Sequence, residues 1–165
     1  MRNISFSFLK RILCLILFFA LLISFVSCKE KKDALTLMEE FISQYSLSGV
    51  VYSPSFGEGE EGYVSDDFFI TMYSESSESV SDFAVLLQGD LDSVGECGVF
   101  LCYSDYDAIL VSSILHRRID FLKSFSLAID TSSLASAFVM RKGRVVVMCA
   151  LSDNELAHSV WKRII

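Results

Sequence analysis

The hydrophobic pattern of this chain changes its period at Val80, and that change constrains the fold more than any other feature. From Val80 to Leu87 the side chains alternate with a period of two, which is typical of a β-strand. Residues 96–103 form a second apolar run, and residues 89–95, rich in glycine and aspartate, predict a turn or loop between them. The two runs together predict an antiparallel hairpin.

The pattern after residue 103 predicts a helix, a second hairpin and a final helix. Apolar residues recur at helical spacing from residue 104 to about residue 124. Two strands, Ala137–Arg141 and Arg144–Leu151, flank Lys142-Gly143, where the glycine favours a tight turn. Asp153 is a good N-cap for a helix that continues to Arg163.

This order of strand, strand, helix, strand, strand, helix predicts an α+β fold with an antiparallel sheet of about four strands and helices on one face. Residues 145–147 are valines, apolar on both faces of a strand, which favours a central position. Ahead of the sheet we expect one or two helices, from Asp33 to Tyr45 and from Ser65 to Tyr73, with a short β-like run at residues 49–52.

The N-terminal segment has the layout of a secretion signal. The run Ile12–Val26 is dominated by apolar residues, follows a basic stretch within residues 2–11, and precedes the small residue Ser27 and then Cys28. A helix that spans a membrane needs roughly 20 apolar residues. Because this run is shorter, we interpret it as a cleaved signal.

Phe25-Val26-Ser27-Cys28 resembles the lipobox of bacterial lipoproteins, with Phe25 where that family commonly has leucine. The resemblance implies that Cys28 Sγ carries diacylglycerol, that the chain is cut before Cys28, and that the protein is lipid-anchored at the cell membrane, facing the cell surface or periplasm. Residues 1–27 are then the signal peptide, 28–33 a tether, and 34–165 a single α+β domain. The alternative is an uncleaved signal anchor in which Cys28 is an ordinary thiol.

Charge restricts the partners of the mature chain. Without residues 1–27 it has 11 Lys and Arg against 21 Asp and Glu, a net charge of −10. Nucleic acid is a poor partner, because binding to phosphates needs clustered cations. Lys29, Lys31 and Lys32, beside the anchor, could contact lipid headgroups or form a solvated tether. An envelope protein is the other partner that we expect, and the sequence predicts no oligomeric state.

Three cysteines remain in the mature domain: Cys97, Cys102 and Cys149. On one extended strand, Cys97 and Cys102 lie about 16 Å apart, beyond the reach of a disulfide. We therefore expect free, buried thiols, the alternative being a bridge between one of them and Cys149. A thiol-dependent hydrolase would need His116 or His158 as its base, and the apolar setting of the thiols disfavours it.

One charged cluster suggests either an internal ion pair or a binding site. Glu96 opens an otherwise apolar strand, and Arg117 and Arg118 lie on the following helix. An ion pair would fix the helix to the sheet, whereas a ligand would find a carboxylate and an anion clamp. The acidic residues within 58–67 lack the spacing of a calcium loop. The sequence therefore predicts no catalytic residue, no cofactor and no metal.

The last 85 residues or so resemble a family of small bacterial lipoproteins whose mature domain is classed as a domain of unknown function. The similarity lies in residues 92–102, in the helix 107–125 with Arg118 and Lys123, and in the hairpin 139–150. It implies a lipid-anchored extracytoplasmic α+β domain. We expect a non-enzymatic protein that binds an envelope partner; the second hypothesis is a small-ligand pocket between helix and sheet, and the third is the thiol hydrolase.

Overall fold

The computed structural model describes residues 32–88, 95–125 and 132–165, within a compact unit that spans residues 32–165. Its elements, in chain order, are α2 (Ala34–Tyr45), β1 (Val50–Tyr52), α3 (Asp66–Tyr73), the 3₁₀ turn η1 (Ser77–Ser79), β2 (Val80–Leu87), β3 (Glu96–Cys102), α4 (Asp105–Phe125), α5 (Ser132–Ala135), β4 (Phe138–Lys142), β5 (Val145–Ala150) and α6 (Asn154–Ile164). The α+β class and both hairpins are confirmed.

One antiparallel sheet contains all five strands in the order β1-β2-β3-β5-β4. The expected count of four is therefore wrong. The β-like run at residues 49–52 forms β1, which pairs with β2 at the edge of the sheet through Val50 and Leu87. β5, the strand of three valines, lies between β3 and β4, so its expected central position is confirmed.

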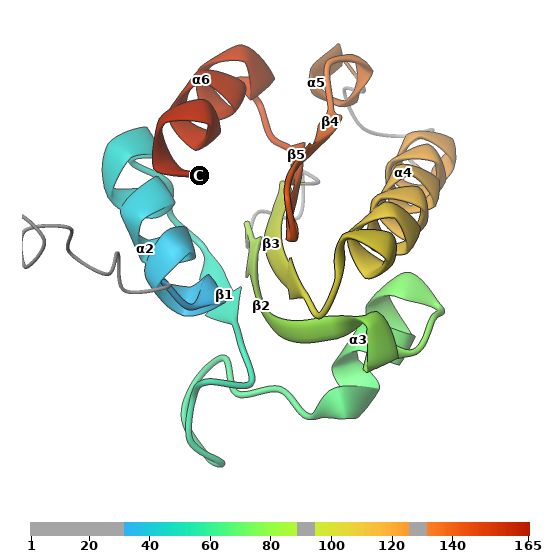
Figure 1. Ribbon diagram of the computed structural model, residues 1–165. Coiled ribbons are helices and arrows are strands. Elements are labelled where there is room, and N and C mark those ends of the chain that lie inside the picture. Colours follow the sequence, from blue (N-terminus) through green and yellow to red (C-terminus); the bar gives the residue numbers. More distant parts are fainter. Residues whose placement is uncertain (1–31, 89–94, 126–131) are drawn as a thin grey trace, which may run out of the picture. The chain divides into compact units, whose positions relative to one another are not determined.

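Helices cover both faces of the sheet, which corrects the prediction of helices on one face. α2 and α6 pack on one face, and α3 and α4 pack on the other (Figure 1). The physical reason lies in the central strands, because β3 is buried along its whole length and β5 along all but its first residue. Strands that are apolar on both faces need cover on both faces.

The two layers of the core differ in composition. On the α2 and α6 face, the ring of Phe41 stacks on Trp161 at a centroid distance of 4.6 Å. On the α3 and α4 face, Phe69 contacts Phe83 and Phe100 edge-on. Aromatic pairs of this kind contribute about 0.5–1.5 kcal/mol beyond their buried area. The sheet is thus held by an aromatic cluster on each side.

The N-cap residues that the sequence predicts for α2 and α6 are confirmed. Asp33 Oδ1 accepts a hydrogen bond from the Thr36 N–H at 2.7 Å, and Asp153 Oδ1 accepts one from the Leu156 N–H at 2.9 Å. Gly143, with φ of 58°, makes the β4–β5 turn that its sequence predicts. The predicted signal peptide, Cys28, and most of the loops 89–95 and 126–133 lie outside the described residues.

Candidate functional site

Glu96 is the first residue of β3 and is almost completely buried at one end of the sheet. Arg118, from the middle of α4, donates from Nε and Nη2 to Glu96 Oε2 at 3.0 and 2.7 Å. Tyr73, the last residue of α3, donates its hydroxyl proton to Glu96 Oε1 at 3.1 Å. Both carboxylate oxygens are therefore bonded, and the buried charge is neutralised by a cation that is itself only 15% exposed.

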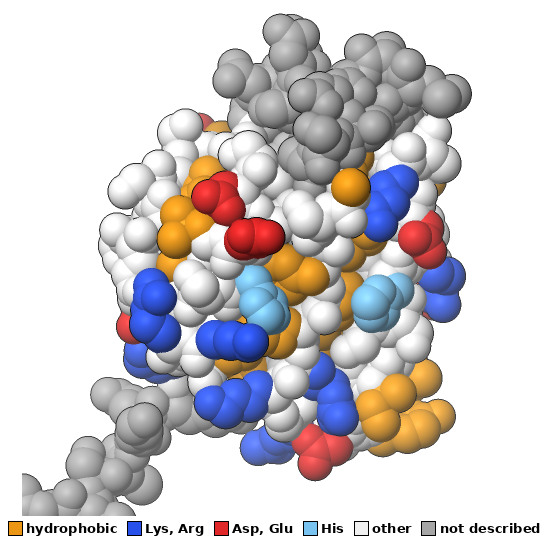
Figure 2. All heavy atoms as spheres, turned by 90° about the horizontal axis from the view of Figure 1, so that it is seen from above, with side chains coloured by type: hydrophobic (Ala, Val, Ile, Leu, Met, Phe, Trp, Pro, Cys, Tyr) orange, Lys and Arg blue, Asp and Glu red, His pale blue; other side chains and the backbone are white. Residues whose placement is uncertain are grey.

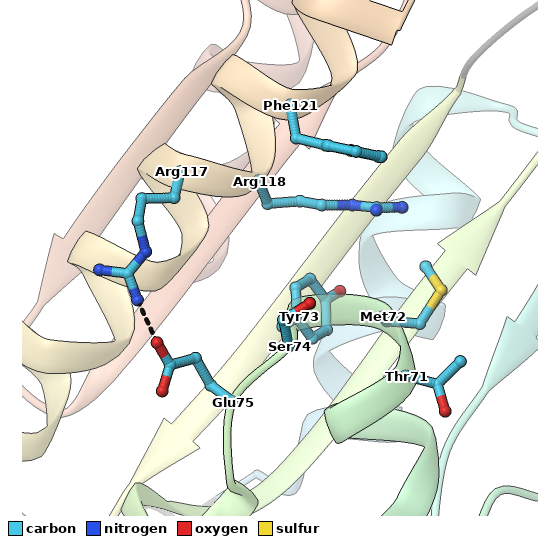
Figure 3. Close-up of a pocket in the computed structure, with 8 residues that line it drawn as sticks. All are labelled: Thr71, Met72, Tyr73, Ser74, Glu75, Arg117, Arg118 and Phe121. Carbon is cyan, nitrogen blue, oxygen red and sulfur yellow. Dashed lines mark hydrogen bonds and ion pairs between the residues drawn. The ribbon is translucent and has the colours of Figure 1, made fainter.

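Aromatic rings flank the guanidinium of Arg118. Its Cζ lies 5.9 Å from the ring centroid of Tyr73 and 5.6 Å from that of Phe121 (Figure 3). Rings at this distance attract a cation through their quadrupoles. Burial, and then the charge of Glu96, raise the pKa of Tyr73 well above its usual value, so this hydroxyl is a hydrogen-bond donor at every physiological pH.

Arg117 extends in a different direction from its neighbour. Its Nη2 lies 2.5 Å from Oε1 of Glu75, just after α3, and both side chains are largely exposed (Figure 3). The structure thus brings together Glu96 and Arg118 of the predicted cluster and leaves Arg117 outside it. The two ion pairs connect α4 to the sheet and to the segment that follows α3.

A shallow pocket of about 260 Å³ opens over these two pairs. Its walls come from the end of α3 and the second half of α4: Thr71, Met72, Tyr73, Ser74, Glu75, Arg117, Arg118 and Phe121. Drug-sized ligands usually occupy pockets of about 300–1,000 Å³. Nε and Nη2 of Arg118 already serve Glu96, and Arg117 pairs with Glu75. The Thr71 hydroxyl donates to the carbonyl oxygen of Asp67 at 2.9 Å, so most polar groups of the lining are engaged within the protein.

Sequence reasoning missed Tyr73, Phe121 and Glu75 as parts of this site. Tyr73 and Phe121 occupy ordinary positions on amphipathic helices, where an aromatic residue is more often a core residue than a partner of a charge. Glu75 lies in a polar connector with other acidic residues. A charged residue at the start of an apolar strand was the one signal present, and it pointed to Glu96.

All three thiols of the domain are buried and free. Cys97 and Cys149 are directly opposite in the register of β3 and β5, with their Sγ atoms 2.8 Å apart, whereas Cys102 belongs to the other face of the sheet. Burial raises the pKa of Cys149 well above its usual value, and burial followed by the charge of Asp107 raises that of Cys102 to about 11. The thiolates of Cys102 and Cys149, the reactive form of these side chains, are therefore disfavoured.

The two histidines have different surroundings. His116 is exposed on α4, and the ring of His158 packs edge-on against Phe138 at 4.9 Å. Among the described residues, no group of three or more His, Cys, Asp or Glu side chains could hold a metal ion. Within the same residues, no helix is both long and apolar enough to cross a bilayer.

Comparisons with known proteins add no further assignment. The chain matches no protein-family model, no curated protein and no solved structure.

Proposed function

We propose that the protein is a lipid-anchored lipoprotein whose domain works outside the cytoplasm and binds an envelope partner without catalysing a reaction. The observation that carries the proposal is the order of the N-terminal segments: a basic start, the apolar run Ile12–Val26, Cys28, and then the first helix at Ala34. Two acyl chains on Cys28 suffice for stable anchoring, because each buried CH₂ contributes about 0.8 kcal/mol.

The side-chain chemistry of the domain supports a binding role over catalysis. The thiols are buried, and the pKa values of Cys102 and Cys149 are raised, so a nucleophilic cysteine is disfavoured. The buried carboxylate of Glu96 is bonded to Arg118 and Tyr73 instead of facing solvent. The buried thiols and the Glu96 cluster therefore belong to the interior of the fold. Contacts with a partner would be made by the exposed surface.

Expression of the full chain in a bacterial host tests the anchor. Mass spectrometry of the membrane fraction should find a mature chain that begins at an acylated Cys28. Cys28→Ser should remove the acyl mass and the processing, whereas the matched variant Cys14→Ser, within the signal, should change neither. The unprocessed Cys28→Ser chain keeps its apolar segment and should remain with the membrane, so the deciding result is the wild type. A wild-type chain that is not cut before Cys28, or whose Cys28 carries no acyl mass, would overturn the proposal.

A small-ligand binder is the second candidate, and the pocket between α3 and α4 favours it. Arg117, whose ion pair with Glu75 is largely exposed, suits a small carboxylate that would replace Glu75 as its partner. Thermal melting with a panel of amino acids and short-chain carboxylates tests this candidate. A stabilising ligand should lose its effect in Arg117→Ala and keep it in Lys123→Ala, which removes another exposed cation of the same helix.

A further inference from the structure

The chain enters its folded domain at one particular end of the sheet. Asp82, Leu101, Val145 and Lys142 are register partners in a row across four strands at that end. The first residue of α2, Ala34, donates its N–H to Asp82 Oδ2 at 2.8 Å. The described chain therefore begins beside this row, which we call the entry end.

Basic side chains gather around the entry end. Lys142 Nζ donates to the carbonyl oxygen of Ile165, which places the C-terminal end of α6 against the β4–β5 turn. On the face drawn in Figure 2, basic side chains gather next to hydrophobic ones, with acidic side chains among them. The exposed basic residues of the turn and of the last turn of α6 are Arg141, Lys142, Arg144, Lys162 and Arg163.

Exposed apolar side chains lie beside these cations. Tyr103 and Tyr106 are 62% and 68% exposed, and Ile109 and Leu110, also exposed, share a face of α4 with Tyr106. Arg144 Nη1 donates to the carbonyl oxygen of Tyr103 at 3.1 Å, so the apolar group adjoins the basic turn. Tyrosines next to lysine and arginine are typical of surfaces that contact lipid headgroups.

Carboxylates at the same end are mostly engaged within the protein. Asp33 caps α2, Asp82 accepts from Ala34, and Asp107 accepts the hydroxyl proton of Ser104 at 2.6 Å. Asp105, in the first turn of α4, and Glu78, in η1 just before β2, are exposed. At the entry end, the exposed lysine and arginine side chains therefore extend further into solvent than the aspartates do, although the domain as a whole is acidic.

We infer that the entry end rests on the anionic surface of the bilayer, with the tyrosines of the α4 start at headgroup level. The inference rests on the proposed lipidation of Cys28. Six peptide steps from Cys28 to Ala34 span at most about 20 Å, so the entry end stays close to the membrane. Each lysine or arginine near an anionic surface then favours docking by roughly five-fold in the ratio of docked to undocked domain.

Hydrogen exchange of the lipidated mature protein tests the docking. The protein is placed in vesicles of phosphatidylcholine alone and in vesicles with about 30% phosphatidylglycerol. With phosphatidylglycerol, amides of residues 103–110 and 141–144 should exchange several-fold more slowly, and the acidic loop 57–62 should be unchanged. About 0.5 M salt should remove the difference, because it screens exposed charges.

Two variants and their matched controls give the effect of single residues. Arg141→Gln should lower the docked-to-undocked ratio about five-fold, whereas Lys123→Gln, in the last turn of α4, should not. Tyr106→Ser should weaken the protection, and Ile70→Ser, an exposed apolar residue of α3, should leave it intact.

Three outcomes would overturn the inference. One is equal exchange at the entry end in both kinds of vesicle. Another is protection that grows with protein density in pure phosphatidylcholine, which would indicate contact between copies. The third is protection of the loop 57–62 in place of the entry end. Failure of lipidation is a separate result, because an unacylated protein would not stay on vesicles of pure phosphatidylcholine.

Discussion

Two consecutive arginines of α4 have opposite surroundings. Arg118 points toward the sheet, pairs with the buried Glu96 and is flanked by aromatic rings, whereas Arg117 points to solvent and pairs with Glu75. The side chains of the inner pair are 15% and 3% exposed, and those of the outer pair are 61% and 44% exposed. The two pairs are equal in formal charge and differ in their contact with water.

That difference decides what each pair contributes. In water an ion pair gains little Coulomb energy and restricts two long side chains, so an exposed pair is worth about 0–1 kcal/mol. In the interior the attraction is stronger, but each charge has lost its hydration. The inner pair therefore stabilises the fold only while both partners are present, and the loss of either one leaves an uncompensated buried charge.

The largest effect should come from breaking the inner pair. Glu96→Ala and Arg118→Ala should each lower the free energy of unfolding by about 3–5 kcal/mol, because each leaves one buried charge without its partner. Urea unfolding followed by circular dichroism measures the change.

A double variant separates the ion pair from simple loss of packing. Glu96→Leu with Arg118→Met removes both charges and keeps most of the buried volume, so it should be much more stable than either single variant. Additive losses in the double variant would contradict our account of the inner pair.

A smaller effect should follow from Tyr73→Phe. The change keeps the ring beside Phe100 and removes only the hydroxyl that donates to Glu96 Oε1. Since a hydrogen bond to a charged group contributes about 1.5–3 kcal/mol, we expect a loss of that size. The same change in an Arg118→Met, Glu96→Leu background should cost much less, and an equal cost in both backgrounds would show that the hydroxyl acts elsewhere.

Much of the fold could be predicted from the sequence, because local signals determine it. The alternation of side chains predicted β2, and the run of valines predicted a central position for β5. Asp33 and Asp153 predicted where α2 and α6 begin. The placement of helices on one face was wrong although the signal was present: β3 is apolar on both sides, which requires cover on both. The fifth strand, β1, has only three residues, and its partner is more than thirty residues away.

The candidate site was predictable only in part. Glu96 stood out as a carboxylate at the start of an apolar strand, and the sequence offered Arg117 and Arg118 equally as partners. The direction in which each arginine points depends on how α4 is rotated against the sheet, and that rotation is set by the packing of Val111, Leu115 and neighbouring residues. Tertiary packing of this kind is not encoded in any short stretch of sequence.

The outer pair should give a small effect, which sharpens the contrast with the inner pair. Arg117→Ala and Glu75→Ala should each change the free energy of unfolding by less than about 1 kcal/mol, and the effect should fall further in about 0.5 M salt. Urea unfolding at low and high salt checks both points. A loss as large as that of Arg118→Ala would mean that exposure does not distinguish the two pairs.

The smallest effect on the free energy of unfolding should come from a change at Asp82. This carboxylate is buried to an intermediate degree, between those of Glu96 and Glu75. Burial raises its pKa above the ordinary value of 3.8, the charge of Asp33 adds to the increase, and hydrogen bonds from the Ala34 and Phe83 N–H groups oppose it. A raised pKa means that the folded chain holds this proton more tightly than the unfolded chain. The resulting stabilisation is complete below pH 3.8 and is lost as pH rises through the folded-state pKa.

Asp82→Asn should therefore compare more favourably with the wild type at pH 7 than at pH 3, because the asparagine has no charge to desolvate. The difference between variant and wild type, measured by urea unfolding at both pH values, cancels the titration of the groups that do not interact with Asp82. A difference that moves the other way would mean that the ionised carboxylate is stabilised at this position. Asp82 would then resemble Glu96, whose charge is compensated, instead of a carboxylate whose burial opposes ionisation.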